Sequence, residues 1–370
     1  MNSSLGWGVL VVVVLAVAGY LVWGPSAKDQ SAEGPVTIGV SAPLTGEAAS
    51  FGEWTKAGID LALKEINDAG GINGQPVTVI YEDDKCNQTG ASVMQKLTSI
   101  DKVTAVLGPV CSAAAGPAVP IAEASKTPTI IWASAPSLPI GKEYIFRSYP
   151  SDAFQGKFAA EYVFNEMGKK KAALLYTKND WGQGLHDTFT KRFTELGGTI
   201  VHDEGVSQDV NDLRTVLTKV KSTDADMIYI PLYPVNAVAA VKAAKDLKVS
   251  LPMVGGDGLE TQEFLSVPEA EGVILTSAHF ENPDDFKARV KEATGVDSGF
   301  VTPLAYDTFK LLIEVIKKAG TNNDAIKEEL QKVFYSGVAI RTISFDEEGD
   351  LASAEFDVKV VKNGKTEILK

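Results

Sequence analysis

A serine at the start of a predicted helix could bind an anion. Before the stretch Gly108 to Pro117, the apolar run Val103 to Leu107 predicts a short buried strand, and within the stretch the small residues after Cys111 predict a helix that begins near Ser112. The first turn of a helix exposes unpaired amide hydrogens, and the helix dipole favours negative charge. This turn is therefore typical of a carboxylate receptor. The alternative is that Ser112 only caps its own helix.

A carboxylate follows another predicted strand. Asp257 lies in the segment Gly255 to Gly258, directly after an apolar run, and loops at strand ends commonly build ligand clefts. An amino acid is a zwitterion, so burying one requires an anion site and a cation site, because an unpaired buried charge is heavily penalised. Ser112 and Asp257 supply one of each. The alternative for Asp257 is turn chemistry, since Asp between glycines is a common turn former.

Three aromatic residues accompany these two polar ones. Trp181 and Tyr233 follow predicted strands in polar or Pro-containing loops, where packing in a core does not explain them. They could cover a ligand or pack one half of the chain against the other. Phe51 opens a helix beside Gly52, and as an alternative it would be a hydrophobic staple of that helix.

Enzyme chemistry lacks its parts in this sequence. The three histidines, His186, His202 and His279, have no close metal-ligand spacing, and no Gly-x-Ser-x-Gly elbow or Walker lysine occurs. We therefore expect no catalytic residue, no metal and no cofactor. The formal net charge is −13 and Lys169 to Lys171 is the largest basic cluster, so nucleic acid is not an expected partner.

The chain contains two cysteines, the number that one bridge needs. Cys86 follows the predicted strand Val77 to Asp83, as Cys111 follows Val103 to Leu107. If neighbouring strands of one sheet carry both cysteines at their carboxyl ends, a disulfide could hold this loop where ligands bind such sheets. A disulfide would require the oxidising, outer side of a membrane.

The elements that must position these residues alternate between strands and helices. The chain has 370 residues, 45% of them apolar, which is enough for two domains. In the first half the predicted strands are Val36 to Ser41, Val77 to Asp83, Val103 to Leu107 and Thr129 to Ile131, and the predicted helices are Phe51 to Asp68, Gln88 to Ile100 and Ala113 to Ser125. This βαβα rhythm indicates a parallel sheet with helices on both faces.

The same rhythm begins again after Pro150. The predicted strands are Ala172 to Tyr176, Thr199 to His202, Met227 to Pro231, Pro252 to Val254 and Val273 to Thr276, and the predicted helices include Ala153 to Met167, Gly184 to Leu196 and Val235 to Leu247. A further helix, Thr302 to Ala319, precedes two strands, Ala339 to Phe345 and Phe356 to Val361. The fold class is therefore α/β, with a second doubly wound lobe.

The N-terminus predicts a membrane segment. Leu5 to Trp23 carries no charge and has aromatic residues near both ends. Ala16 to Ala18 could pass for a cleavage site, but no Lys or Arg precedes the apolar run, unlike an ordinary signal peptide. We expect residues 1–24 to be an uncleaved N-terminal transmembrane anchor and residues 25–35 to be a flexible linker. The remainder would lie outside the cytoplasm.

From Val36 to the C-terminus the chain resembles the Leu/Ile/Val-binding proteins of ABC transporters, which are type I periplasmic binding proteins. The resemblance rests on ordered motifs: Ile38 to Gly46, Gly70 to Gly74, Asp83-Asp84 before Cys86, Cys111-Ser112, Tyr176 to Gly184, Tyr233-Pro234, Gly255 to Gly258 and Phe345 to Leu351. No single motif would be specific, but the ordered series is.

The resemblance implies two α/β lobes joined by three chain crossings. The N-terminal lobe would comprise residues 36–147 and 281–342, and the C-terminal lobe residues 148–280 and 343–370. The crossings would fall near Arg147 to Tyr149, Ser277 to Phe280 and Arg341 to Phe345. The two lobes would close on a ligand in the cleft between them.

The resemblance also implies roles for single residues. Ser112 and backbone groups around Ala135 would hold the carboxylate of an amino acid, Asp257 would meet its ammonium group, and the aromatic side chains of Phe51, Trp181 and Tyr233 would close over it. Cys86 and Cys111 match the disulfide of the family. The implied function is capture of an amino acid, branched-chain or similar aliphatic, by a monomer that delivers it to an ABC permease.

One departure from the family pattern concerns the carboxylate site. Where the pattern often has a threonine, this chain has Pro136, which supplies neither a backbone donor nor a hydroxyl. Ser134 or Ser137 could compensate, and Trp132 stands where smaller residues are usual. Two alternatives therefore remain: a ligand-sensing receptor of the same fold, or a binder of amides or carboxylates.

Overall fold

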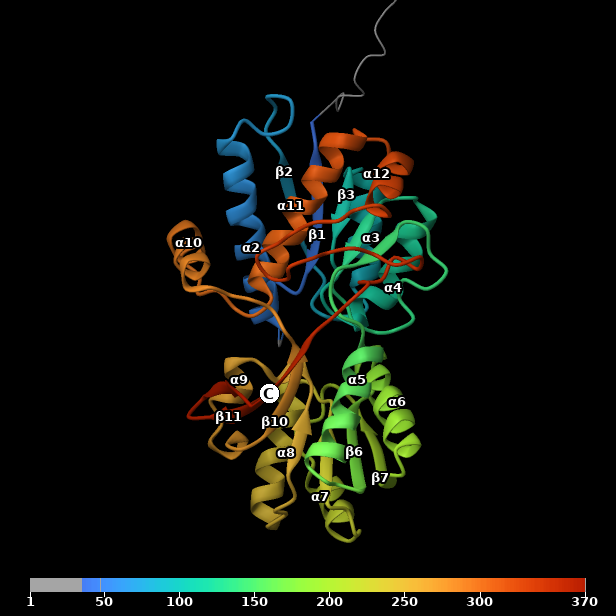
Figure 1. Cartoon of the computed structure of the whole chain (residues 1–370), viewed down its shortest axis with the longest axis vertical. Coiled ribbons are helices and arrows are strands. Elements are labelled where there is room, and N and C mark those ends of the chain that lie inside the picture. The colour runs from blue at the N-terminus through green and yellow to red at the C-terminus, as the bar shows by residue number, and fades with distance from the viewer. Residues whose placement is uncertain (1–34, 47, 370) are drawn as a thin grey trace, which may run out of the picture.

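The structure is a computed structural model that describes residues 35–46 and 48–369. Figure 1 shows two lobes, one above the other, each built around its own β-sheet. The predicted membrane segment, residues 1–24, lies outside the described residues, as does the linker up to residue 34. Within the described part of the chain, no helix is long and apolar enough to cross a membrane.

The first sheet is parallel throughout, as the βαβα rhythm predicts. Its strands are β1 (Thr37–Ala42), β2 (Thr78–Asp83), β3 (Ala105–Leu107), β4 (Thr129–Ile131) and β5 (Ile145–Arg147), in the order β2-β1-β3-β4-β5. The carboxyl ends of these strands all point to the same edge of the sheet. Ser112, Cys86 and Cys111 follow strands at that edge, which faces the second lobe.

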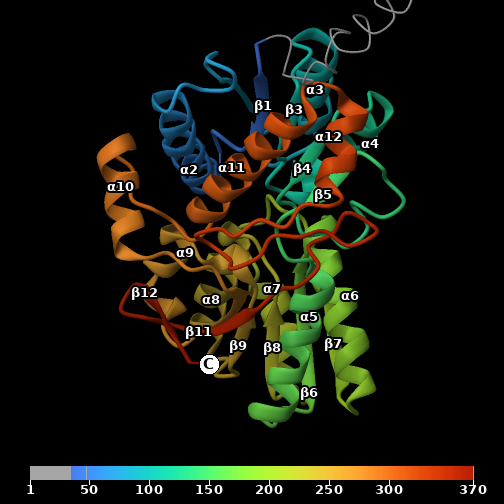
Figure 2. The same ribbon diagram turned by 45° about the horizontal axis from the view of Figure 1, so that its top comes forward.

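Helices cover both faces of the first sheet. Side chains alternate along a strand, so Leu107 packs on the face covered by α2 (Ala49–Asp68) and α11 (Thr302–Ala319), whereas Val106 faces the other helices. Those helices are α3 (Gly90–Gln95), which continues as a π-helical turn over Lys96–Ile100, and α4 (Ser112–Ala124). Helices α10 (Asp284–Thr294) and α12 (Asn323–Leu330) complete this lobe, as Figure 2 shows for α12 beside α11.

Helices α2 and α11 approach closely at a glycine. A Cβ atom on Gly58 would lie 2.3 Å from the backbone oxygen of Thr302, well inside contact distance. Any other residue at this position would push the helices apart. The start of α11 thus lies against the middle of α2, and residues from the first turns of both helices line the space between the lobes.

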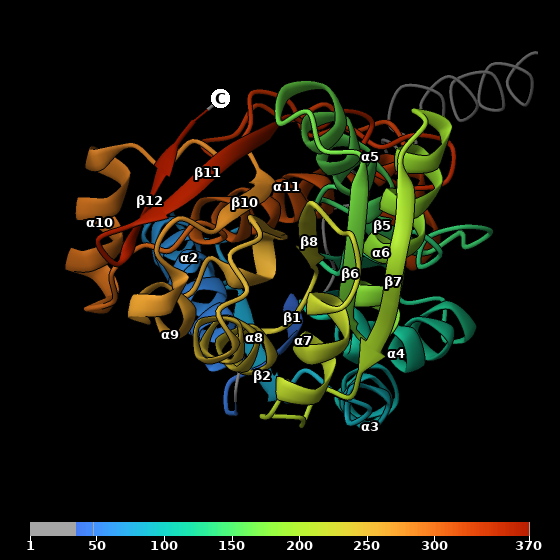
Figure 3. The same ribbon diagram turned by 90° about the horizontal axis from the view of Figure 1, so that it is seen from below.

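The second sheet is mixed. Its parallel strands are β6 (Lys171–Thr177), β7 (Thr199–Val206), β8 (Met227–Ile230), β9 (Met253–Gly255) and β10 (Ile274–Ala278), and β11 (Phe356–Lys362) and β12 (Lys365–Ile368) pair antiparallel at one edge. The strand order is β12-β11-β10-β9-β8-β6-β7. Seen from below in Figure 3, β11 and β12 lie at one edge of the lobe and β7 at the other.

The helices of the second lobe also divide between two faces. They are α5 (Asp152–Glu161) with a π-helical turn over Tyr162–Glu166, α6 (Asp180–Glu195), α7 (Arg214–Lys221), α8 (Pro234–Leu247) and the short α9 (Gln262–Leu265), with 3₁₀ turns at Asp257–Leu259 and Pro268–Ala270. Leu174 packs against α5 and α6, whereas Leu175 on the same strand packs against α7 and α8. The second doubly wound lobe is therefore confirmed.

The segment between α12 and β11 differs from the sequence prediction. Ala339 to Phe345 was expected to be a strand, but it forms only isolated bridges, Tyr335 with Ile343 and Phe345 with Leu351. Ile343, Phe345 and Leu351 all pack in the first core cluster with α2 and α11. Consequently the chain enters the second sheet after Leu351, although residues 343–351 were expected to belong to the C-terminal lobe.

A buried arginine fixes this segment against the first sheet. Arg147, at the end of β5, donates from Nε to Asp350 Oδ1 at 2.8 Å and from Nη2 to Asp350 Oδ2 at 2.5 Å. Its Nη1 also donates to the backbone oxygen of Ala135 at 2.7 Å. The side chain of Arg147 is fully buried, so its charge requires this two-pronged carboxylate partner. The same arginine holds the loop that contains Ala135.

Candidate functional site

A cavity lies between the two lobes. Its volume, counted as the space that the centre of a water molecule can occupy, is about 70 Å³. One water needs about 10–15 Å³ on this measure, so the cavity suits a small molecule. Six of the seven predicted ligand-binding residues line it, namely Phe51, Ser112, Ser134, Trp181, Tyr233 and Asp257. The seventh, Ala135, is buried next to Ser134 but is not part of the lining.

Ser112 begins helix α4, as predicted, but it does not cap that helix. The capping position is Cys111, and no side chain bonds to the first turn. The Ser112 oxygen instead accepts the backbone N–H of Ala135 at 3.1 Å. A hydroxyl that accepts one hydrogen bond still has its own proton to donate. Ser112 can therefore donate into the cavity, and the capping alternative is wrong.

The loop after β4 supplies a second hydroxyl. Ser134 lines the cavity and is 5% exposed, whereas Ser137, the other candidate to compensate for Pro136, is exposed and outside the lining. Pro136 itself packs against Gly184 of the second lobe. The approach is so close that a Cβ atom added to Gly184 would lie 2.8 Å from the Pro136 Cδ atom. Trp132 forms part of the cavity wall, and its ring nitrogen donates to Thr308 at 3.3 Å.

Asp257 projects into the cavity from the second lobe, directly after β9. Its Oδ2 accepts the hydroxyl proton of Tyr149 at 2.5 Å, and its Oδ1 is buried with no hydrogen-bond partner among the described residues. Burial raises the pKa of Asp257, while the hydrogen bond from Tyr149 and the nearby N–H groups of Gln155 and Gly258, neither of which makes a hydrogen bond of ordinary geometry to it, act in the opposite direction. The free Oδ1 is the acceptor that a cationic ligand group would satisfy.

A second carboxylate lies behind the cavity wall at the start of α5. Asp152 is fully buried, and neither of its oxygens makes a hydrogen bond of ordinary geometry within the described chain, although the nearby Ser134 hydroxyl favours its charged form and so acts to lower its pKa. Burial first, and then the negative charge of Asp257, raise the pKa of Asp152 well above its ordinary value. Because two buried carboxylates repel each other, Asp152 is the one expected to hold a proton.

Aromatic rings form the walls on both lobes. Trp181 and Tyr233 stack with ring centroids 5.0 Å apart on the second lobe, and Phe51 meets Phe300 edge to face at 6.1 Å on the first. Phe51 thus contacts a residue outside its own helix, in the turn before α11, and is more than a hydrophobic staple. Trp181 lies in the first turn of α6 and not in a loop as predicted, because the Asn179 side chain caps that helix by accepting the Gly182 N–H at 2.9 Å.

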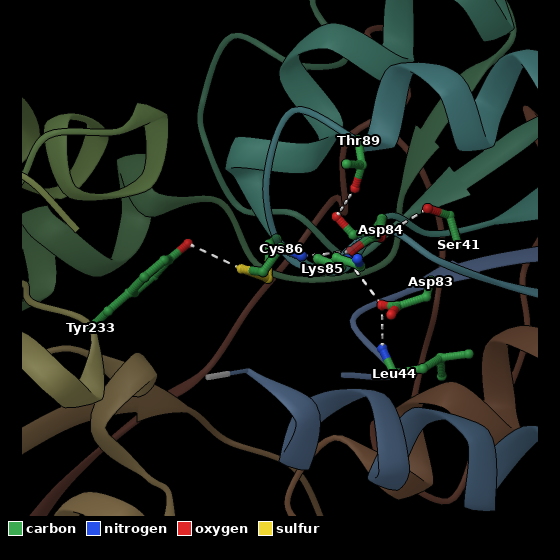
Figure 4. The surroundings of a disulfide bond; sticks show 9 residues. Ser41, Leu44, Asp83, Asp84, Lys85, Cys86, Thr89 and Tyr233 are labelled. Carbon is green, nitrogen blue, oxygen red and sulfur yellow. Dashed lines mark hydrogen bonds between the residues drawn. A yellow bond between two sulfur atoms is a disulfide. The ribbon is translucent and has the colours of Figure 1, made fainter. Parts of the chain in front are cut away.

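Cys86 and Cys111 form a disulfide, as predicted, and it lies at the edge of the cavity. Figure 4 shows its surroundings, with Tyr233 approaching from the other lobe. The Tyr233 hydroxyl lies 3.7 Å from Cys86 Sγ, and it is the donor because a bridged sulfur has no proton. The bridge therefore contributes directly to the contact between the lobes.

A buried carboxylate holds the loop that carries Cys86. Asp84 Oδ1 accepts the Cys86 N–H at 2.9 Å, and its Oδ2 accepts the Ser41 hydroxyl at 2.8 Å (Figure 4). Burial raises the pKa of Asp84 to about 6, although these two hydrogen bonds favour its charged form. The loop is thus fixed by both a covalent bond and a polar network.

Several wall residues were not predicted from the sequence. Tyr149 comes from the first crossing between the lobes, Phe300 and Val301 directly precede α11, and Leu304 and Ala305 lie in its first turn. Tyr149 follows β5, which was not predicted, and the other four follow no strand, so the rule that led to Ser112 and Asp257 did not reach them. The apolar periodicity predicted that α11 is a helix, but it could not show which end of the helix borders the cleft.

The charge of the lining is asymmetric. Among the described residues that line the cavity, Asp257 is the only carboxylate, and none is Lys, Arg or His. The neighbouring cation, Arg147, is already paired with Asp350. A carboxylate ligand group would therefore meet neutral donors only, while a cationic group would meet a buried negative charge.

The comparisons with known proteins agree with this architecture. The Leu/Ile/Val-binding protein homolog 3 of Brucella melitensis is 31% identical over 348 residues, covering 89% of this chain and 92% of the relative. The structure of the leucine binding protein LivK from Thermotoga maritima superposes with a TM-score of 0.84 at 27% identity, covering 90% and 98% of the two chains. The branched-chain amino acid binding protein LivJ from Streptococcus pneumoniae, solved with isoleucine, gives 0.82 at 30% identity, covering 91% and 100%.

The family comparison covers nearly all of the described chain. Residues 35–365 match the family described as Periplasmic binding protein. The disulfide, the interlobe cavity and both lobes up to the start of β12 lie within that range. The chain therefore belongs to the periplasmic binding protein family.

Proposed function

We propose that this protein captures one amino acid, branched-chain or similar aliphatic, between its lobes and delivers it to the permease of an ABC transporter. The observation that carries the proposal is that Oδ1 of Asp257 has no hydrogen-bond partner among the described residues and that no Lys, Arg or His is among the described residues that line the cavity. Membership of the family supports a binding protein outside the cytoplasm and not an enzyme. The relatives named for leucine, isoleucine and valine support the class of ligand.

The ammonium group of the ligand would pair with Asp257. A buried carboxylate whose oxygen has no partner destabilises the closed cleft, and a cation relieves this cost. The carboxylate group of the ligand would lie at the N-terminus of α4, where the Ser112 and Ser134 hydroxyls add donors to the free helix amides. Each end of the zwitterion thus has a complementary site, on opposite lobes.

The side chain of the ligand would occupy the apolar part of the cavity. Trp132, Val301 and Leu304 line the first-lobe side, and Trp181 and Tyr233 cover it from the second. Burial of an aliphatic side chain in such a pocket contributes about 1.5 to 3 kcal/mol. The small volume excludes peptides and nucleotides.

One alternative ligand class has an observation in its favour. The Ala135 N–H is already bonded to Ser112, Pro136 has no N–H, and burial raises the pKa of Asp257. A protonated Asp257 would donate to an amide or carboxylate ligand and would need no amine. A ligand-sensing receptor of the same fold would use the same cavity but signal to a different partner.

The arrangement around the two lobes also belongs to this proposal. We infer that residues 1–24 tether the chain to the membrane as an N-terminal helix, with residues 25–35 as the linker, and that the protein acts as a monomer. The N-terminal lobe would comprise residues 36–147 and 281–342 and the C-terminal lobe residues 148–280 and most of 343–370. The packing of Ile343 and Leu351 supports a third crossing shortly before β11.

The test is a calorimetric titration of the full chain with L-leucine, L-isoleucine and L-valine. For the amino acid that binds most tightly, the matching acid without the amine should bind far more weakly. Asp257→Ala should lose about 3 to 5 kcal/mol because it leaves the ammonium group unpaired, or about two to four orders of magnitude in affinity. Ser112→Ala removes one neutral donor and should lose about 1 to 3 kcal/mol.

The order of these two losses decides the ligand class. If Asp257→Ala binds as well as the parent, and the acid without the amine binds equally, the ligand has no positive amine. The amide or carboxylate alternative would then replace the amino acid.

A further inference from the structure

Tyr149 makes a hydrogen bond that joins the two lobes at the wall of the cavity. Its ring packs in the first core cluster, with residues of the first sheet and α11, whereas its hydroxyl reaches Asp257 of the second lobe at 2.5 Å. Both residues are 6% exposed. A short bond between a hydroxyl and a carboxylate, shielded from water, is among the stronger kinds of hydrogen bond.

The same ring contacts a second crossing between the lobes. Tyr149 lies between β5 and α5 in the first crossing, and Phe280 follows β10 in the second. Their rings meet edge to face with centroids 5.5 Å apart. A movement of the lobes about these crossings therefore changes the position of the Tyr149 hydroxyl relative to Asp257.

The bond leaves the two oxygens of Asp257 in different states. Oδ2 is occupied by Tyr149, while Oδ1 has no partner among the described residues and borders the cavity. Without Tyr149 the carboxylate could rotate and present either oxygen. With it, one oxygen is held and the other is directed to the ligand.

We propose that Tyr149 is a positioning residue of the ligand site: it holds Oδ2 of Asp257 so that Oδ1 receives the ligand's ammonium group, and it links that contact to the hinge. This inference rests on the proposed function, since it needs a ligand with an amine. It adds a residue that the resemblance did not assign.

The charge state of Asp257 gives the inference a measurable consequence. The titratable groups around it are Tyr149 from the first crossing, Asp152 from α5, Glu260 from the turn after β9, and Tyr229 and Tyr233 from β8 and its following loop. Glu260 is paired with Lys359 at 2.9 Å. Of the groups that donate to Asp257, Tyr149 is the one that also contacts the hinge.

Removal of this donor should change how ligand binding depends on pH. Donation from Tyr149 favours the ionised form of Asp257, which is the form that pairs with an ammonium group. In Tyr149→Phe the pKa of Asp257 should rise further, because burial is then opposed by fewer donors. Affinity should fall about 10- to 100-fold at pH 7, and the midpoint of its pH profile should move to higher pH.

The experiment measures the dissociation constant of the full chain between pH 4 and pH 8. The probe is whichever of L-leucine, L-isoleucine and L-valine binds the parent most tightly, because its own groups do not titrate in this range. Tyr144→Phe is the matched control: it removes a tyrosine hydroxyl that donates to Asp324, outside the cavity, and should leave the profile unchanged. Phe280→Leu loosens the packing of the two crossings but keeps the Tyr149 hydroxyl that donates to Asp257, so it should weaken binding about equally at every pH.

Each outcome separates this inference from the proposed function. The inference is supported if Tyr149→Phe binds the ligand more weakly than the parent and the midpoint of its pH profile moves to higher pH. If the parent needs the amine but Tyr149→Phe binds unchanged, or loses affinity equally at every pH as Phe280→Leu does, Tyr149 is only structural and the inference fails alone. If the parent binds the acid without the amine equally well, both fail. Tyr149→Met, which fills the same apolar space, replaces Tyr149→Phe if that variant does not fold.

Discussion

Ser112 and Asp257 show which single residues a sequence can reveal. Both follow predicted strands, so each was expected at the carboxyl edge of its own sheet. That the two edges face each other across one cavity was implied by the family resemblance and not by the strand assignment. Their hydrogen bonds did not follow. That Ser112 would accept the Ala135 N–H, and that Tyr149 would hold Asp257, depends on loops packed in three dimensions.

Trp181 shows a signal that was present but not used. It was expected in a loop, yet Asn179 followed by Asp180 is a typical helix start, and α6 begins there. Tyr149 and Phe300 offered no comparable signal. Tyr149 reaches the cavity from a crossing between the lobes and Phe300 from the turn before α11, so their place depends on how distant parts of the chain pack together.

Asp84 gives a prediction at the scale of one residue. Its folded pKa of about 6 lies above the ordinary 3.8, so its stabilising contribution is fully present below pH 3.8 and is lost as the pH rises through 6. A shift of this size corresponds to about 3 kcal/mol. Asp84→Asn keeps an acceptor for the Cys86 N–H and presents an NH2 donor to the Ser41 oxygen, and it has no proton to titrate. It should therefore flatten the fall in the free energy of unfolding between these pH values, as measured by urea denaturation.

The neighbouring carboxylate is the matched control. Burial acts to raise the pKa of Asp83, but donations from Thr45, Lys85 and Leu44 prevail and lower it. Its stabilising contribution is therefore present above the ordinary value and lost as the pH falls. Asp83→Asn should reduce stability at neutral pH, and equal effects of the two substitutions would contradict this account.

At the scale of elements, local pattern predicted most helices and strands of both sheets. The apolar β-branched runs gave β1 to β4 and β6 to β11 within a few residues, and α11 was predicted with its observed bounds. Ala339 to Phe345 failed because alternation alone cannot provide a partner strand. This segment packs across the first lobe and finds only single bridges at Ile343 and Phe345.

The disulfide is the element-scale feature with the clearest energetic consequence. Cys86 and Cys111 are 25 residues apart, and closing a loop of this length should stabilise the fold by about 3 kcal/mol. Replacement of both cysteines by alanine should lower the free energy of unfolding by about this amount. It should also weaken ligand binding, because Tyr233 loses its partner on the first lobe.

Two measurements check this prediction. A thiol titration of the denatured, non-reduced chain should find no free thiol. Two free thiols, or a double variant as stable as the parent, would show that the bridge does not hold the loop in solution.

At the scale of the whole molecule, the two lobes are built alike and meet at the cavity. Each has a doubly wound sheet, and the contacts between them come from loops and helix starts at the facing edges. The doubling of the βαβα rhythm predicted this architecture. The place of the third crossing was less well predicted, since it depends on whether Ile343 to Leu351 packs on one lobe or the other.

Closure follows from the placement of the two ligand sites on opposite lobes. A ligand that contacts Ser112 on one lobe and Asp257 on the other stabilises the arrangement in which both contacts exist. Without the ligand, the buried Oδ1 of Asp257 has no partner and opening of the cleft restores its hydration. The central claim is that one ligand bridges the lobes.

Small-angle scattering of residues 35–370, with and without a saturating amount of the most tightly bound amino acid, tests this claim most directly. We predict a smaller radius of gyration in the parent on saturation, with Asp257→Ala remaining at the larger value at the same ligand concentration. An unchanged radius in a parent that calorimetry shows to be saturated would contradict the account, because the ligand would then bind without bringing the lobes together.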